Sequence, residues 1–277
     1  MTKKQKQKQV VQAEIVEENL LPFAKRSMLE YGKYTLEQRA IPDFRDGLKP
    51  VHRRIAWAAH QLGLTAKKGL VKKSARLVGD VLGKYHPHGD AACYQAMVSM
   101  VHLNYPLIFG SGNFGTLVDP AAAQRYTEAR LDHYADDVFF HPDYINVTDT
   151  TGNFDNTEQE PIILNALLPN LLLNGAFGIA TGGRCAIPCF EKEGVITLTK
   201  KAIQGKAVTV KDCLKHLVPT SAEGASAWLE DDDDIENIKN FYETGMGSVY
   251  WVPEYEMDVA KKSITVFGFP PIVAQGL

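Results

Sequence analysis

The sequence predicts an α+β fold in two units, a helix-turn-helix core with a β wing followed by a smaller α/β or α+β module. Three short helical patterns follow one another between residues 51 and 103, and the connections between them are basic. An apolar, glycine-rich stretch comes next, and helical and strand-like segments alternate beyond residue 193. At 277 residues the chain has room for two domains of ordinary size.

Residues 1–34 are expected to form a tail and a helical arm. "MTKKQKQKQ" is basic and lacks the apolar stretch of a signal peptide, so we expect a solvated, disordered tail. Residues 10–31 have a helical pattern that Pro22 is expected to interrupt. Residues 39–50 contain two prolines and one glycine, which predicts a loop.

The helix-turn-helix core is predicted from three apolar stripes. They indicate helices over residues 51–64, 74–85 and 90–103. Ser74 and Asp90 stand where the second and third helices begin, so they are the expected N-caps.

The stretch after these helices, "LIFGSGNFGTLVD", is typical of a hairpin or wing, so a winged-helix domain is expected over residues 35–150. Residues 160–192 are apolar and punctuated by proline and glycine, which predicts buried backbone passing through a second unit. That unit, residues 151–277, holds a helical segment, "EGVITLTKKAIQG", and two strand-like ones, "GSVYWVPEYEMDV" and "SITVFGF".

Basic residues are concentrated in one part of an acidic chain. The formal net charge is −3, yet residues 45–90 hold ten bases and three acids, a local charge of +7. This segregation is typical of a surface that binds a polyanion, although a merely solvated surface would give the same count. The ten bases are Arg45, Lys49, Arg53, Arg54, Lys67, Lys68, Lys72, Lys73, Arg76 and Lys84.

Membrane association and metal binding are disfavoured. No apolar run is long enough to span a bilayer. The four cysteines form no Cys-x-x-Cys pair, which disfavours structural zinc and favours free thiols in a reducing compartment. "EDDDD", residues 230–234, is interpreted as a solvated acidic loop. We therefore assign no metal site to this chain.

Two basic motifs carry the side chains that phosphate contact requires. In "DGLKPVHRR" a proline begins a helix whose first turn carries His52, Arg53 and Arg54. Free backbone N–H groups and three basic side chains converge there, which suits a phosphate backbone. In "KKSARLVGDVLGKYHPHGD" lysines stand on both sides of a helix. Its His86 and His88 are too few ligands for a metal, and phosphate contact or proton transfer suits them better.

"AAAQRYTEARL" places Tyr126 directly after Arg125. A free phenol has a pKa near 10 and is a poor nucleophile at neutral pH. Arg125, with Arg130 four residues after Tyr126, could stabilise a phenolate and the charge on an attacked phosphate. The alanines before the pair leave room for a duplex. From these residues alone, Tyr126 is either a nucleophile or a core aromatic.

Five segments occur in an order that resembles one known family: "RAIPDFRDGLKPVHRR", "KKSARLVGDVLGKYHPHGD", "GSGNFG", "AAAQRYTEARL" and "LLPNLLLNGAFGIATG". From about residue 30 to its end, the chain resembles the breakage-reunion subunit of type IIA DNA topoisomerases. That family includes the gyrase A subunit, its topoisomerase IV counterpart and the separate cleavage subunit of phage enzymes. The resemblance implies a winged-helix DNA-cleavage domain followed by an incomplete tower-like domain.

The resemblance also implies roles for single residues. Tyr126 matches the tyrosine that attacks a DNA phosphate and stays joined to the 5′ end, and Arg125 matches its transition-state arginine. Arg39 and His88 match other catalytic basic residues, and Ile179 matches an isoleucine wedged between base pairs. The segment that grips the duplex is implied to act through Lys49, His52, Arg53, Arg54, Lys72, Lys73, Arg76, Lys84 and His86.

Partners and cofactors are likewise implied. One tyrosine cuts one strand, so a double-strand break needs two chains and a twofold homodimer is expected. A gyrase B-like partner is implied to hold Mg²⁺ in a Toprim domain and to bind ATP, which makes the complex an ATP-dependent type II topoisomerase. The family's coiled-coil gate is expected to be absent. The chain is expected in the bacterial cytoplasm, or in a host's if it is phage-encoded.

Two other functions remain open at this point. The first is a catalytically silent winged-helix protein that binds DNA or acts as a scaffold. It would bind duplex without ever becoming joined to it. The second is a tyrosine recombinase, whose helical catalytic domain fits the ordered motifs badly.

Overall fold

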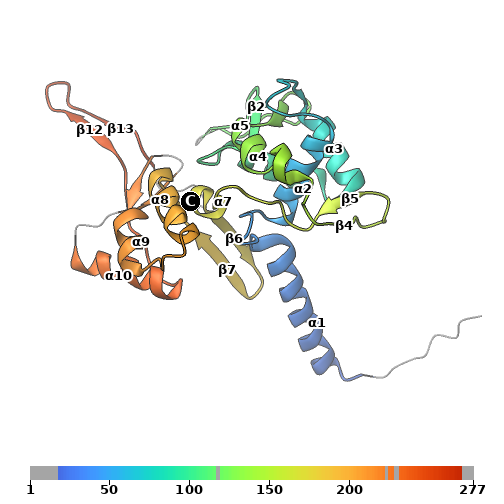
Figure 1. Cartoon of the computed structure of the whole chain (residues 1–277), viewed down its shortest axis with the longest axis horizontal. Helices are drawn as coiled ribbons and strands as arrows, with labels where there is room; N and C mark the ends of the chain where they lie inside the picture. Colours follow the sequence, from blue (N-terminus) through green and yellow to red (C-terminus); the bar gives the residue numbers. More distant parts are fainter. Residues whose placement is uncertain (1–17, 117–118, 222–223, 228–230, 270–277) are drawn as a thin grey trace, which may run out of the picture.

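The computed structural model describes residues 18–116, 119–221, 224–227 and 231–269. Figure 1 shows two parts on either side of the β6–β7 hairpin, with helix α1 projecting away from both. The first part, drawn in blue and green, contains α2, α3 and α4, and the second, drawn in orange, contains α8, α9 and α10. Within these described ranges, no helix combines the length and the apolar content that crossing a bilayer requires.

The first part contains the predicted helical core. Its elements are α1 (Leu20–Thr35), the π-helix η1 (Leu36–Ala40), α2 (Pro50–Gln61), β1 (Lys72–Lys73), α3 (Ser74–Lys84), α4 (Asp90–Val101), β2 (Ile108–Ser111), β3 (Glu128–Leu131), α5 (His133–Val138), α6 (Pro142–Ile145), β4 (Thr150–Gly152) and β5 (Gln159–Pro161). The three predicted helices of the helix-turn-helix core are therefore confirmed as α2, α3 and α4. The loop predicted over residues 39–50 is shorter than expected and covers residues 41–49, because residues 39 and 40 belong to η1 and Pro50 begins α2.

Both predicted N-caps are wrong. The residues in cap position are Lys73 and Gly89, one place earlier than expected, and neither makes a side-chain cap bond. The Ser74 hydroxyl is buried and accepts a hydrogen bond from Thr127 Oγ1 instead. The Asp90 carboxylate accepts from Gln124 Nε2. Both side chains thus form hydrogen bonds with residues distant in sequence instead of capping the helix that they begin.

The helical arm is continuous where the sequence predicted a break. Helix α1 runs from Leu20 to Thr35, and Pro22 lies in its first turn. A proline is tolerated there because the first amides of a helix have no carbonyl partner within the helix. Residues 10–17 of the predicted arm and the predicted tail lie outside the described residues.

The wing is a three-stranded antiparallel sheet in the order β1-β3-β2. Strand β2 comes from the predicted glycine-rich stretch, but its partner is not in that stretch. It pairs with β3, with Ile108 opposite Leu131 and Ser111 opposite Glu128. The segment between these strands carries Tyr126, so the wing frames the candidate nucleophile.

The second part combines helices with small antiparallel sheets. Its elements are α7 (Asn170–Asn174), β6 (Ala176–Ala180), β7 (Gly183–Ile187), β8 (Cys189–Phe190), α8 (Lys192–Ile203), α9 (Val210–His216), β9 (Pro219–Thr220), β10 (Ser226–Ala227), α10 (Asp232–Thr244), β11 (Trp251–Val252), β12 (Tyr255–Asp258) and β13 (Ser263–Val266). Among the described residues every strand pair is antiparallel, which makes this part α+β rather than α/β.

Two predictions for this part need correction. Residues 160–192 are not uniformly buried backbone, because β6 and β7 form a hairpin on which Phe177 and Ile179 are exposed. The acidic run is not a loop over its described part, because residues 232–234 form the first turn of α10. The carboxylates of Asp233 and Asp234 lie at the positive end of this helix, which offsets their mutual repulsion. Residue 230 lies outside the described residues.

Each part has its own apolar core. The larger one joins α2, α3, α4 and the wing, and it includes Ile55, Leu77, Met97 and Leu131. It also takes in Leu164, beyond the boundary expected at residue 150. A smaller core lies under α8 and α9 and consists of Leu173, Phe190, Val195, Leu198 and Leu217.

Candidate nucleic-acid interface

Tyr126 stands in a turn on the surface, with 64% of its side chain exposed. The guanidinium carbon of Arg125 lies 4.6 Å from the centre of its ring. The phenol is therefore accessible to a large substrate, and a positive charge is stacked on its ring. The sequence left open a core aromatic, and this exposure excludes it.

The Tyr126 turn is fastened to the N-terminus of α3. The first amides of that helix donate to the turn's carbonyls, from Ser74 to Thr127 at 2.9 Å and from Ala75 to Gln124 at 3.1 Å. The buried Thr127 hydroxyl is also 2.9 Å from the Tyr94 hydroxyl. The first amides of α3 have no carbonyl partner within the helix, and these bonds supply one. The same bonds hold the Tyr126 turn against the N-terminus of α3, which is the positive end of the helix dipole.

Exposed bases surround this turn. Lys72 and Lys73 form β1, which pairs directly with Glu128 and Ala129 of β3. The Lys73 ammonium is 3.0 Å from Glu128, and the Lys73 side chain is exposed while that of Glu128 is partly buried. Arg76 is exposed on the next turn of α3, with Asp80 at 3.6 Å. These side chains make weak surface pairs and remain free to exchange them for phosphate.

Arg130 does not reach Tyr126. Its guanidinium lies over the ring of Phe109, 4.2 Å from the centre, and Nη1 donates to the carbonyl of Leu131. The expectation that it would assist the phenolate is therefore wrong. Strand β3 places it beside β2, where Phe109 is directly opposite in register.

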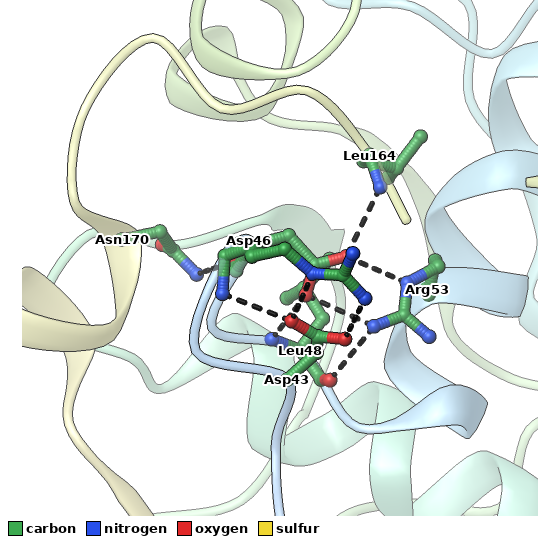
Figure 2. A network of polar contacts seen from close by, with 7 residues as sticks. Asp43, Asp46, Leu48, Arg53, Leu164 and Asn170 are labelled. Atoms are coloured by element: carbon green, nitrogen blue, oxygen red, sulfur yellow. Dashed lines mark hydrogen bonds and ion pairs between the residues drawn. The ribbon is translucent and has the colours of Figure 1, made fainter. Parts of the chain in front are cut away.

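Arg53 lies inside the protein, on one side of the network in Figure 2, and Asp46 lies at its centre. Its Nε is 2.6 Å and its Nη2 3.0 Å from the carboxylate of Asp46, which is fully buried. That carboxylate also accepts from the amides of Leu48 and Leu164, and the Asp46 carbonyl accepts from Asn170. With its guanidinium engaged in this way, Arg53 has a structural part, and the expected phosphate contact from it is withdrawn.

Arg54 is directed at two residues distant in sequence. Its Nε and Nη2 donate to both carboxylate oxygens of Glu160, at 2.6 and 2.8 Å. Its Nη1 is 3.0 Å from Nδ1 of His86. Burial, His88 and Arg54 lower the pKa of His86 to about 4. The ring centres of His86 and His88 are 4.1 Å apart, and His88 is exposed.

Lys84 is the remaining base of this segment, at the end of α3. Its ammonium is 3.4 Å from Asp80 and 3.6 Å from Glu158. Burial acts to lower the pKa of Lys84, but the two carboxylates outweigh it and raise the pKa, so this side chain is a cation at neutral pH. The charge is half-buried and shared between two acids.

Lys49 and His52 begin helix α2. The Lys49 ammonium donates to the carbonyl of Phe177 at 2.6 Å, and burial lowers its pKa. Burial, with Lys49 and Arg53 nearby, lowers the pKa of His52 to about 3, so this imidazole is neutral at pH 7. Lys49 thus ties the start of α2 to the β6–β7 hairpin.

That hairpin also packs on η1, which carries the exposed Arg39. A Cβ added at Gly178 would lie 2.0 Å from the carbonyl oxygen of Ala40, so only glycine permits this approach. The next residue, Ile179, projects with 68% of its side chain exposed. Single π-helical turns occur often at functional sites, and this one holds Arg39 beside an exposed apolar side chain.

The contacts thus divide the predicted residues into three groups. The first group lies at the α3 N-terminus and consists of Tyr126, Arg125, Lys72, Lys73 and Arg76. The second lies near the α3 C-terminus and consists of Arg54, His86, His88 and Lys84. The third lies at the junction with the hairpin and consists of Arg39, Lys49 and Ile179, while His52 lies in the first turn of α2. Sequence reasoning missed Glu160, because its partner Arg54 is 106 positions away and no local pattern marks the pair.

Comparisons with known proteins identify the family of the chain. The sequence model of the family described as the A subunit of DNA gyrase/topoisomerase IV matches residues 39–275. The DNA gyrase A subunit of Streptococcus pneumoniae is 42% identical over 267 residues, 94% of this chain and 32% of its own length. The DNA topoisomerase 4 A subunit of Pseudomonas aeruginosa is 42% identical over 249 residues, 87% of this chain and 32% of its own length.

A more distant source gives the same result. The chloroplastic/mitochondrial DNA gyrase A subunit of Arabidopsis thaliana is 45% identical over 210 residues, 73% of this chain and 22% of its own length. The chain therefore spans about a third or less of these relatives. Because the family model covers most of its residues, the chain belongs to the family of DNA gyrase and topoisomerase IV A subunits.

Proposed function

We propose that this chain is the DNA-breaking and rejoining part of a type IIA topoisomerase. The observation that carries the proposal is the exposed Tyr126 beneath the Arg125 guanidinium, on a turn flanked by exposed lysines. Membership of the family supports it, since the relatives are named as gyrase and topoisomerase IV subunits.

The proposed reaction is a transesterification at phosphorus. Tyr126 Oη forms a bond to a backbone phosphorus, the bond to the 3′ oxygen breaks, and the 5′ phosphate stays on the tyrosine. The phenol loses a proton and the leaving 3′ hydroxyl gains one, so the step is balanced. One ester replaces another, and reversal reseals the strand without outside energy. Arg125 stabilises the charge that builds on phosphorus, and Arg39 and His88 are the other basic residues of the proposed catalytic site.

The duplex is proposed to lie across the exposed bases. Lys72, Lys73 and Arg76 contact phosphates near the cut, and Lys84 and His86 extend the contact along α3. Ile179 is proposed to enter between base pairs, because it is apolar, exposed and held on a hairpin packed against η1. Lys49, which donates to the carbonyl of Phe177, orients this hairpin against α2, and His52 in the first turn of α2 is proposed to contact the duplex.

The complete activity is proposed to need further chains. Two tyrosines are required for a double-strand break, so a homodimer with twofold symmetry is part of the proposal. The described residues bring together no three His, Cys, Asp or Glu side chains that could hold a metal ion. As the resemblance to the family implies, we propose that Mg²⁺, which would stabilise phosphate charge, and ATP are bound by a Toprim- and ATPase-bearing partner. The boundaries at residues 34 and 150 and a cytoplasmic location are likewise proposals.

The experiment mixes the purified chain with that partner, Mg²⁺ and end-labelled duplex, and then denatures the mixture. We expect protein-linked DNA with the wild type and none with Tyr126→Phe. Tyr34→Phe, another exposed tyrosine, is the matched control and should retain the adduct. Duplex binding by both variants should fall steeply with salt. Binding without any adduct in the wild type would instead favour the non-catalytic DNA-binding or scaffolding protein.

A further inference from the structure

Glu160 can influence His86 indirectly, through Arg54, which contacts both residues. Its carboxylate is nearly buried, with a tenth of the side chain exposed, and it holds Arg54 by two parallel hydrogen bonds. A bidentate pair of this kind fixes the plane of the guanidinium. The remaining nitrogen, Nη1, then meets His86 Nδ1 at 3.0 Å.

The direction of that contact determines the protonation of His86. A guanidinium carries only donors, so Nδ1 of His86 must accept with its lone pair. A histidine that accepts at Nδ1 is neutral and carries its proton on Nε2. The pKa of about 4 for His86 agrees, because a neutral ring is favoured beside a cation and away from solvent. His86 can therefore offer an N–H donor from Nε2 without adding a charge.

His88 depends on the same ring. The two imidazoles are stacked at 4.1 Å with an angle of 22° between their planes. The backbone amide of His88 also donates to the carbonyl of His86 at 2.7 Å. A ring that is fixed at His86 thus fixes one face of His88, which is otherwise exposed.

The hairpin that carries Glu160 is itself anchored to both neighbouring helices. Asn153 Nδ2 donates to the carbonyl of Lys84, at the end of α3, at 2.6 Å. Trp57 Nε1, on α2, donates to the carbonyl of Gln159 at 3.0 Å. These two hydrogen bonds therefore fix the backbone of Glu160 without any contribution from Arg54.

We propose that Glu160 is a positioning residue, which through Arg54 keeps His86 in the neutral, Nε2-protonated form and so holds His88 in place. That His88 serves DNA cleavage rests on the proposed function, whereas the tautomer of His86 does not. The alternative is an ion pair that only joins β5 to α2.

The direct test is nuclear magnetic resonance on the full chain labelled with ¹⁵N-histidine, without DNA or partner. Long-range ¹H–¹⁵N correlations distinguish the two tautomers, and His86→Gln assigns the signal. At pH 7 we expect wild-type His86 to show an unprotonated Nδ1 and a protonated Nε2. A protonated Nδ1 overturns the proposal without any further variant.

Variants then test the part played by Glu160. In Glu160→Ala the His86 signal should move toward a mixture of tautomers, and Glu160→Gln, which keeps one acceptor, should lie between that and the wild type. Glu158→Gln is the matched control, since its side chain pairs with Lys84 at 3.6 Å and makes no contact with Arg54 in the described structure. An unchanged tautomer in a folded Glu160→Ala protein overturns the proposal.

A cleavage assay with the partner separates this inference from the function. Glu160→Gln should lower adduct formation by about tenfold while duplex affinity stays unchanged, as expected for a misplaced catalytic group. An equal loss of affinity and of adduct would contradict a positioning role. If neither the wild type nor the variants form an adduct but the His86 tautomer changes in the Glu160 variants, then the proposed function fails and the positioning of His86 by Glu160 is retained.

Discussion

The two parts of the molecule differ in how deeply their ion pairs are buried. Around α2, the Asp46 carboxylate and the Arg53 guanidinium are buried together, and backbone amides add further bonds to the carboxylate (Figure 2). In the second part, the ion pairs of the described residues, such as Lys201 with Asp212, leave both side chains at least partly exposed. The cores differ likewise, because the first joins three helices and a sheet and the second is small.

This difference shows that a buried ion pair contributes more to the arrangement of its neighbours than to the stability of the fold. Desolvating an ion pair gives little net stability, but it holds side chains in one arrangement, and losing one member leaves the other unpaired. His52 and Arg54 flank Arg53 in the chain, so the network also fixes the backbone from which these two side chains extend. The second part is held by amphipathic helices and caps, which place no such demand on single residues.

The largest effect is expected from Asp46→Ala. The change leaves the Arg53 guanidinium buried without a counter-ion, so we expect the free energy of unfolding to fall by about 3–5 kcal/mol. Hydrogen exchange should speed up in α2 and stay unchanged in α9. Asp43→Ala removes the partner of Arg45, in a pair that is substantially exposed, and should cost no more than about 1 kcal/mol. Equal acceleration in α9 would mean that the two parts unfold as one.

The junction between the parts is tested by Gly178→Ala. The added Cβ would lie 2.0 Å from the carbonyl oxygen of Ala40, so the hairpin must move off η1. We expect a loss of about 2–3 kcal/mol in thermal unfolding, as for an overpacked core. The control is Gly79→Ala on α3, where nothing lies within 4 Å of the new Cβ. A helical alanine there should stabilise by up to about 1 kcal/mol.

Acid should weaken the first part before the second. Burial lowers the pKa of His52 to about 3 and that of His86 to about 4. Below pH 6.5 these two histidines are therefore protonated in the unfolded chain while they stay neutral in the folded chain. Stability is thus complete above pH 6.5 and falls as the pH drops toward 4, by at most about 1.4 kcal/mol per pH unit for each histidine. In the second part, Lys201 lowers the pKa of Asp212, whose contribution is lost only below the ordinary range of a carboxyl.

Urea titrations at a series of pH values measure this slope. His52→Gln should flatten it between pH 6.5 and 4.5, since one of the histidines whose pKa is lowered by burial is gone. A slope that persists unchanged in His52→Gln would assign the effect to other groups.

A local change in the second part should have the smallest effect. Thr209 and Asp212 form a capping box at the start of α9, in which each side chain bonds the other residue's amide. Thr209→Ala should cost about 1 kcal/mol, and its effect on hydrogen exchange should stay within α9 and its neighbours. Thr197→Ala, which removes a hydroxyl bonded only within its own helix, should change stability by less than about 0.5 kcal/mol.

Local pattern predicted the helical core well. The apolar stripes of α2, α3 and α4 lie within single segments, so periodicity alone located them. What failed depended on partners distant in sequence. Ser74 has the residue type of a cap but is used by Thr127, 53 positions away. Strand β2 was assigned to a local hairpin, yet its partner follows Tyr126.

The candidate site was predictable in kind but not in detail. Basic composition and the family resemblance indicated which residues matter, yet Arg53 and Arg54 look alike in the sequence. The first turns inward to Asp46 and the second toward Glu160 and His86, which only tertiary structure reveals. The exposure of Tyr126 follows from the long β2–β3 connection, and no periodicity reports it.

The central claim is that the Tyr126 oxygen becomes esterified to DNA. The direct measurement is to trap the complex of wild-type chain, partner, Mg²⁺ and duplex, digest protein and DNA, and locate the residual nucleotide by mass spectrometry. The account predicts a phosphodeoxynucleotide on Tyr126, joined through the 5′ phosphate. A nucleotide on any other residue, or one linked through a 3′ phosphate, would contradict it.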